Sequence, residues 1–128
     1  MARILIVDDD EPTCRTLMRL VRMAGHTADC VLDAPRAMEV IRAQAPDLVI
    51  LDVNMPGMSG IDVLAVLKSD EATVGIPVIM YSAADDAAAE RKARELGAAD
   101  FWVKAATHFV QIELKIDAFL RTRERANP

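Results

Sequence analysis

Residues 47–60 read DLVILDVNMPGMSG and contain a carboxylate in an unusual position. The four apolar residues at 48–51 lead directly into Asp52, and proline and glycine residues then break the chain. A continuous apolar run bounded by such residues is typical of a strand that is buried on both faces of a sheet. We therefore expect a buried strand that ends in an acid, and the remaining sequence indicates what the acid is for.

Short apolar runs recur along the chain, and helical patterns lie between them and after the last one. The runs cover residues 3–7, 27–31, 47–51, 76–81 and 100–103. Apolar residues at spacings of three and four predict the helices, as in Cys14, Leu17 and Val21 before Gly25. Strands that alternate with helices predict an α/β fold, a parallel sheet with helices on both faces and right-handed connections.

The composition restricts the class of function. The chain has 128 residues, 52% of them hydrophobic, which suits one domain with a substantial core. Fifteen basic and twenty acidic residues give a net charge of −5, and no basic stripe indicates nucleic-acid binding. No apolar run approaches the ~20 residues of a membrane span, and the N-terminus does not read as a signal peptide, so we expect a cytoplasmic location. In that compartment Cys14 and Cys30 are expected to be free thiols in the core, in neither a disulfide nor a metal site.

Polar side chains stand at the carboxyl ends of several predicted strands, where open parallel sheets bind ligands. They are Asp8, Asp9 and Asp10 after the first strand, Asp52 after the third, Ser82 after the fourth and Lys104 after the fifth. Clustered carboxylates repel one another, and Mg²⁺, which prefers oxygen ligands, offsets that charge. A cation held by carboxylates beside a lysine and a hydroxyl suits a phosphoryl group, which a carboxylate can accept as an aspartyl-phosphate. Asp52 stands where such an acceptor belongs.

Each of these residues has a simpler interpretation when it is taken alone. An aspartate after a strand, such as Asp52, is usually a turn or cap residue. The acidic run before Pro12 suits the N-terminus of a helix. Lys104 alone reads as a surface lysine, and Ser82 alone as a loop residue. Their joint occurrence at strand ends favours a common site.

Four segments, in order along the chain, resemble the receiver domains of bacterial two-component response regulators. The segments are ILIVDDDEP at 4–12, DLVILDVNMPGMSG at 47–60, IPVIMYSA at 76–83 and GAADFWVK at 97–104. The resemblance implies a flavodoxin-like, doubly wound, five-stranded parallel sheet with strand order 2-1-3-4-5 and five helices. It extends over essentially the whole chain, so we expect a receiver (response regulatory) domain over residues 1–122 and a charged, frayed tail over residues 123–128.

Carried over position by position, the resemblance implies a metal site and a phosphoryl acceptor. Asp52 would be the acceptor and also a metal ligand. Asp8 and Asp9 would be the acidic pair that holds Mg²⁺, Asp9 directly and Asp8 through water. The backbone carbonyl of Asn54 would complete the protein ligands.

The resemblance also implies a switch. The Ser82 hydroxyl would move to the phosphoryl group, Lys104 would be its counter-ion, and Phe101 would be the aromatic residue whose rotamer follows Ser82. Two features depart from the family pattern. Phe101 has no hydroxyl, so any signal there must come from packing, and Ala105 replaces the usual proline, so we expect a trans bond after Lys104. Ala84 is expected to influence how fast water removes the phosphoryl group.

The expected function is that of a phosphorylation-dependent signalling receiver, which catalyses only its own phosphorylation and dephosphorylation. A sensor histidine kinase or phosphotransfer protein would donate the phosphoryl group to Asp52. The helix at 85–96, the fifth strand and the last helix would then present a changed surface to a downstream protein or to a second copy of the chain. We expect no direct binding to nucleic acid or membrane.

Other functions stay open with different weight. A pseudo-receiver would share the fold and act as a protein-interaction module without phosphorylation. A small phosphatase with a nucleophilic aspartate is disfavoured by Glu11, and a flavodoxin-like electron carrier is disfavoured because the acidic run at 8–11 would repel a phosphate. The chain could be a stand-alone regulator or a part of a longer one.

Overall fold

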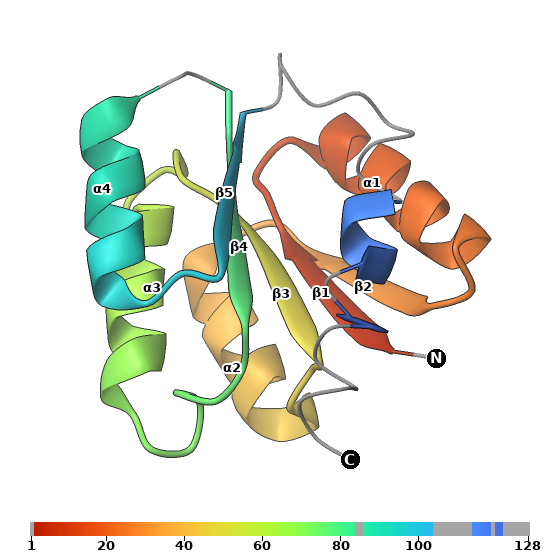
Figure 1. Cartoon of the computed structure of the whole chain (residues 1–128), viewed down its shortest axis with the longest axis horizontal. Helices are drawn as coiled ribbons and strands as arrows, with labels where there is room; N and C mark the ends of the chain where they lie inside the picture. Colours follow the sequence, from red (N-terminus) through yellow and green to blue (C-terminus); the bar gives the residue numbers. More distant parts are fainter. Residues whose placement is uncertain (1, 84–85, 104–113, 119, 122–128) are drawn as a thin grey trace.

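The computed structural model describes residues 2–83, 86–103, 114–118 and 120–121 (Figure 1). Strands and helices alternate along these residues. The elements are β1 (Arg3–Val7), α1 (Glu11–Met23), β2 (Thr27–Val31), α2 (Ala34–Gln44), β3 (Leu48–Asp52), α3 (Gly60–Ser69), β4 (Val78–Ser82), α4 (Ala87–Leu96) and β5 (Asp100–Val103). A C-terminal helical segment follows at residues 114–118 and 120–121. In the part of the chain that the structure describes, no helix is both long and apolar enough to cross a membrane.

The five strands form one parallel sheet in the order β2-β1-β3-β4-β5, as expected from the sequence. The strand order reverses direction at β1, which lies between β2 and β3. The carboxyl ends of β1 and β3 therefore flank the point where open α/β sheets bind ligands. The register aligns Val7 with Leu51 across these two strands. Asp8, the residue after β1, is thus brought beside Asp52, the last residue of β3.

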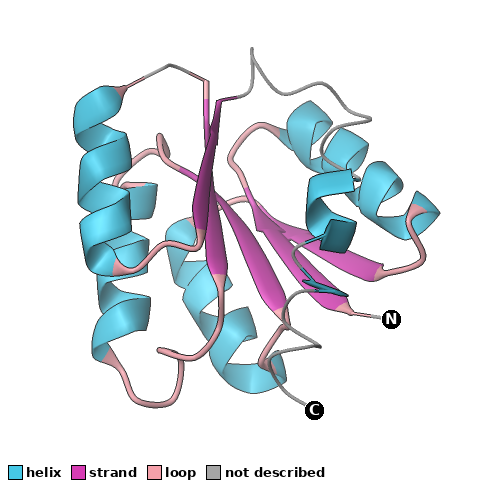
Figure 2. Ribbon diagram, in the orientation of Figure 1, coloured by secondary structure: helices cyan, strands magenta, loops and turns pink. Residues whose placement is uncertain are grey.

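Helices cover both faces of the sheet (Figure 2). Alternate residues of each strand point to opposite faces, and each face has its own buried cluster. Toward α2, α3 and α4 lie Leu5, Val7, Val49, Leu51, Met80 and Phe101. Toward α1 and the C-terminal segment lie Ile4, Ile6, Leu48, Ile50, Ile79, Tyr81 and Trp102. Burial on both faces explains why the strands read as continuous apolar runs, and each buried Leu or Ile contributes ~1.5–3 kcal/mol.

Side-chain caps fix where the helices begin. The Asp10 carboxylate accepts a hydrogen bond from the Thr13 amide at the start of α1. At the start of α3, Ser59 and Asp62 form the capping box that their spacing predicts. Gly97 ends α4 with a φ of 102°, which glycine adopts without strain. The predicted start of the last helix at residue 107 lies outside the described residues.

The predicted ends of two strands differ from the observed ones by one or two residues. β3 includes Asp52, and β4 runs from Val78 to Ser82. Pro77 has no N–H to contribute to the sheet, although its carbonyl accepts a hydrogen bond from the Val49 amide (3.0 Å). Asp52 and Ser82 are therefore the last residues of their strands, and the backbone pairing of the sheet holds them directly.

Cys14 of α1 and Cys30 of β2 form a disulfide, so the prediction of two free thiols is wrong. Their Cα atoms are 6.0 Å apart, within the usual range of about 4.4–6.8 Å. The prediction rested on compartment and on the small number of cysteines. The pairing depends instead on the way α1 packs across β2, which brings together two residues 16 positions apart. The bond thus joins the elements on either side of residues 24–26.

Candidate functional site

Three carboxylates meet at the carboxyl ends of β1 and β3. Asp8 and Asp9 follow β1, Asp52 ends β3, and one oxygen from each lies within 4.8 Å of the others. Asp8 and Asp52 are 1% and 4% exposed, whereas Asp9 is exposed. The acid cluster, as we name these three residues, is therefore embedded in the sheet on one side and open to solvent on the other.

Backbone amides orient the two buried carboxylates. Asp8 Oδ1 accepts a hydrogen bond from the Asp10 amide (2.9 Å), and Asp52 Oδ1 accepts one from the Asn54 amide (3.3 Å). In both cases the donor lies two residues further along the chain, as in an Asx turn. The Asp8 amide also donates to the Val31 carbonyl (3.1 Å), which extends the pairing of β1 with β2 by one residue. These contacts turn the chain away from the sheet and fix the direction of the carboxylates.

The charge of the acid cluster favours a bound cation. Two unit charges about 4 Å apart repel by ~1 kcal/mol in water and by ~4 kcal/mol near a protein surface. All three donors are carboxylate oxygens, which suit hard cations such as Mg²⁺ better than soft ones such as Zn²⁺. Mg²⁺ usually keeps several waters, and the exposed side at Asp9 leaves access for them. The donor set therefore fits the predicted magnesium ion.

The other predicted residues lie at neighbouring positions of the sheet or outside the described part. Ser82 ends β4, is 1% exposed, and stands one residue beyond Tyr81, the register partner of Asp52. Phe101 is 7% exposed and packs in the core between the sheet and the helices α2, α3 and α4. Asn54 is exposed in the turn after β3.

Three further predictions concern residues outside the described part of the chain: the position of Lys104, the bond from Lys104 to Ala105, and the place of Ala84. Among the described residues, the structure thus brings the predicted acids together and puts Ser82 at the end of the next strand.

One residue beside the acid cluster was not predicted from the sequence. Gly60, the first residue of α3, is buried against the backbone of Asp52. The sequence marks it only as a chain breaker near the end of the stretch 47–60. The signal that could have identified it is a glycine at the first position of a helix, where alanine has the higher helix propensity.

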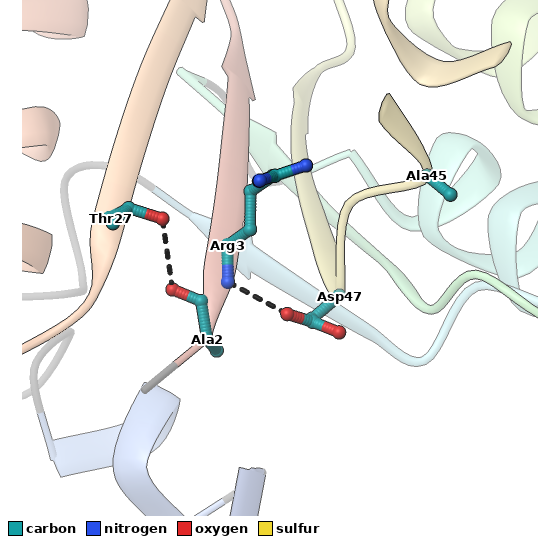
Figure 3. Close-up of a pocket in the computed structure, with 5 residues that line it drawn as sticks. All are labelled: Ala2, Arg3, Thr27, Ala45 and Asp47. Atoms are coloured by element: carbon teal, nitrogen blue, oxygen red, sulfur yellow. Dashed lines mark hydrogen bonds between the residues drawn. The ribbon is translucent and has the colours of Figure 1, made fainter. Parts of the chain in front are cut away.

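A hollow of about 340 Å³ lies at the opposite end of the strands from the acid cluster (Figure 3). It is lined by Ala2, Arg3, Thr27, Ala45 and Asp47. The Arg3 amide donates to Asp47 Oδ2 (2.8 Å), and the Thr27 hydroxyl donates to the Ala2 carbonyl (3.3 Å). These groups join the amino ends of neighbouring strands, so the hollow lies far from the acid cluster and we give it a structural role.

Solved structures of receiver domains share this fold. A CheY-like receiver domain protein from Methanospirillum hungatei superposes with a TM-score of 0.91 at 21% identity, covering 99% of both chains. A response regulator described as putative, from Chloroflexus aurantiacus, superposes with a TM-score of 0.86 at 27% identity, covering 94% of this chain and 98% of the other.

Curated relatives are more similar in sequence and are longer. The response regulator PleD of Caulobacter vibrioides is 38% identical over 103 residues, which is 80% of this chain and 23% of PleD. The DNA-binding response regulator MtrA of Mycobacterium tuberculosis is 38% identical over 102 residues, which is 80% of this chain and 43% of MtrA. The chain thus spans less than half the length of these relatives. The family described as the response regulator receiver domain matches residues 4–114, which include the acid cluster. Because this match covers most of the chain, the protein belongs to the family of response regulator receiver domains.

Proposed function

We propose that Asp52 accepts a phosphoryl group from a sensor histidine kinase or a phosphotransfer protein, with Mg²⁺ bound at the acid cluster. Receiver domains of response regulators serve phosphorylation-dependent signalling, and this chain is one of them. The observation that carries the proposal is the position of Asp52. It ends a fully buried strand, and its carboxylate lies within 4.8 Å of the oxygens of Asp8 and Asp9.

In the proposed transfer, one Asp52 oxygen attacks the phosphorus of a phosphohistidine. The new bond joins that oxygen to phosphorus, and the phosphorus–nitrogen bond breaks, so that the histidine leaves with the electron pair. The hydrogen bond from the Asn54 amide to Asp52 Oδ1 fixes the carboxylate before attack. Bound Mg²⁺ would neutralise charge on the phosphoryl oxygens. Asp8, Asp9 and Asp52 would hold the ion, with the Asn54 carbonyl as a further ligand.

Ser82 and Phe101 are the proposed route from the site to the surface. Ser82 would donate its hydroxyl proton in a hydrogen bond to a phosphoryl oxygen, and Lys104 would pair with the phosphoryl charge. Phe101 is packed in the core with its backbone aligned to Met80, two residues before Ser82. A shift of β4 at Ser82 would therefore reach α4 and β5 through packing, since Phe101 has no hydroxyl.

The surface of α4 and β5 is held by exposed ion pairs. Arg94 Nε lies 3.1 Å from Glu90 Oε2, and its Nη2 lies 3.4 Å from Asp100 Oδ1. Exposed pairs of this kind contribute only ~0–1 kcal/mol each. They can rearrange at little cost, which supports α4 and β5 as the face presented to a downstream protein or to a second copy. The proposal includes a receiver domain over residues 1–122, a tail over residues 123–128 and a cytoplasmic location.

Phosphorylation of intact protein tests the proposal. The parent protein, Asp52→Asn and the control Asp29→Asn, whose exposed carboxylate lies on β2, are incubated with acetyl phosphate and MgCl₂. Intact mass spectrometry should find one phosphoryl group on the parent and on Asp29→Asn, and none on Asp52→Asn or after chelation of Mg²⁺ by EDTA. A phosphoryl adduct retained in Asp52→Asn would contradict the assignment. No adduct on any protein, and no response to beryllofluoride, would favour the pseudo-receiver.

A further inference from the structure

The first residue of α3 lies directly against the peptide bond that follows the proposed phosphoryl acceptor. The Gly60 amide donates a hydrogen bond to the Val53 carbonyl (2.8 Å). A Cβ atom placed on Gly60 would lie 2.8 Å from the carbonyl carbon of Asp52, 3.0 Å from the Cα of Val53, and closer still to the Asp52 carbonyl oxygen. Side chains essentially never tolerate such distances to backbone atoms, because backbone cannot move aside as a flexible side chain does. This position therefore requires glycine as long as Asp52 stays where it is.

Backbone conformation does not explain the glycine. The glycines with positive φ in the described residues are Gly25, Gly57 and Gly97, and Gly60 is not among them. Gly60 opens a regular helix, where alanine would be more favourable by up to ~1 kcal/mol. The close approach to Asp52 is therefore the physical reason for glycine at this position.

The contact between Gly60 and Asp52 is additional to the strand pairing that holds Asp52 in the sheet. β3 pairs with β1 on one side and with β4 on the other, where Asp52 aligns with Tyr81. Gly60 closes the turn that follows, and the Ser59–Asp62 capping box fixes where α3 begins. The first turn of α3 therefore packs against the backbone of Asp52, whose carboxylate lies close to those of Asp8 and Asp9.

We propose that Gly60 is a positioning residue for Asp52. By lacking a Cβ atom, it lets α3 pack against the Asp52–Val53 peptide and so sets the distance from the Asp52 carboxylate to the rest of the acid cluster. The turn that Gly60 closes also contains Asn54. The same contact therefore fixes the position of the Asn54 carbonyl, which is the proposed further metal ligand. The catalytic meaning of this role rests on the proposed function of Asp52, whereas the placement of the Asp52 carboxylate does not.

Two alanine variants test the role. Gly60→Ala is compared with Gly75→Ala, because nothing lies within 4 Å of a Cβ atom at Gly75 and its φ is not positive. Both variants are measured at a low temperature, chosen so that circular dichroism confirms that they are folded. Gly60→Ala should raise the dissociation constant for Mg²⁺ about tenfold, as mutations of residues that contact and orient metal ligands do. It should also lower the maximal rate of phosphorylation by acetyl phosphate at saturating Mg²⁺. A mere loss of stability moves neither quantity while the protein is folded.

The outcomes separate the two proposals. Parent-like Mg²⁺ affinity and maximal rate in a folded Gly60→Ala would overturn the positioning role. A parent protein that takes up no phosphoryl group would overturn the proposed function and leave the positioning role to be decided by a crystal structure of Gly60→Ala. The Asp52 carboxylate should be displaced in that structure, and an unmoved carboxylate would overturn the role.

A measurement on the parent protein covers the case in which Gly60→Ala does not fold. During a titration with MgCl₂ followed by nuclear magnetic resonance, the amide signals of Gly60 and Asn54 should shift with the same midpoint, and that of Gly75 should not shift. An unshifted Gly60 amide beside a shifting Asn54 amide would show that the contact does not transmit the position of Asp52, which overturns the proposal.

Discussion

Asp8 directly follows β1 and Asp52 ends the neighbouring strand β3, and one oxygen of each lies within 4.8 Å of the other and of an oxygen of Asp9. The sheet causes this proximity, because the register pairs Val7 with Leu51, and Asp8 and Asp52 directly follow these two residues. Both aspartates are buried. The fold therefore holds like charges together, at a cost in stability that a cation removes. This cost can be measured.

Removing one charge of the acid cluster should stabilise the metal-free protein. In Asp9→Ala, the loss of repulsion should raise the free energy of unfolding by ~1 kcal/mol without Mg²⁺, the value for charges about 4 Å apart in water, because Asp9 is exposed. With saturating Mg²⁺ the order should reverse, because the parent gains binding energy that the variant lacks. Urea unfolding with and without MgCl₂ measures both. Asp29→Ala, at an exposed position of β2, should show neither effect, and an Asp9→Ala that binds Mg²⁺ as the parent does would remove Asp9 from the ligands.

Phosphorylation should loosen or rearrange α4 and β5 more than the opposite side of the molecule. The pairs from Arg94 to Glu90 and to Asp100 are exposed and weak, and the second of them joins α4 to β5. Hydrogen exchange with and without beryllofluoride and Mg²⁺ should therefore change protection over residues 87–103. The control is α2, where protection should stay the same. Equal protection over residues 87–103 in both conditions would exclude this surface as the output face.

The sequence predicted the parts of this structure that depend on neighbours along the chain. Alternation and apolar runs gave the strands, the spacing of Ser59 and Asp62 gave a cap, and acids after strands gave the acid cluster. The parts it did not predict depend on distances across the fold. Neither the pairing of Cys14 with Cys30 nor the contact of Gly60 with the backbone leaves a local pattern, because each arises from how a helix packs on the sheet.

Lys68 ties α3 to the turn before β4, and its replacement should destabilise the fold. Its Nζ donates to the carbonyls of Val74 (3.0 Å) and Ile76 (2.8 Å), which would lose their N–H donors in Lys68→Met. We expect a loss of ~1–3 kcal/mol in the free energy of unfolding, because two hydrogen bonds of ~0.5–1.5 kcal/mol each are removed. Lys92→Met, at an exposed position of α4, should change it little. Equal stability of both variants would exclude this role.

The contribution of Lys68 should also depend on pH. Partial burial lowers the pKa of Lys68 from its usual 10.5. Between the folded and unfolded pKa values the unfolded chain holds more protons, so this group makes stability rise with pH. The difference in stability between the parent and Lys68→Met should therefore grow as pH rises from neutral toward 10.5. Urea unfolding of both proteins across this range measures it, and a difference that shrinks with pH would contradict the sign.

The disulfide between Cys14 and Cys30 should form in the purified protein and stabilise it. Protein prepared in air and unfolded without reductant should show no free thiol, and dithiothreitol should add the mass of two hydrogens. Joining residues 16 positions apart should stabilise the fold by ~3 kcal/mol, as the chain-entropy estimate gives for a loop of about 15 residues. The double variant Cys14→Ala, Cys30→Ala should resemble the reduced parent apart from lost packing, and dithiothreitol should leave its stability unchanged. If the parent has two free thiols after exposure to air, or if dithiothreitol does not lower its unfolding midpoint, the bond is not part of the stable fold in solution.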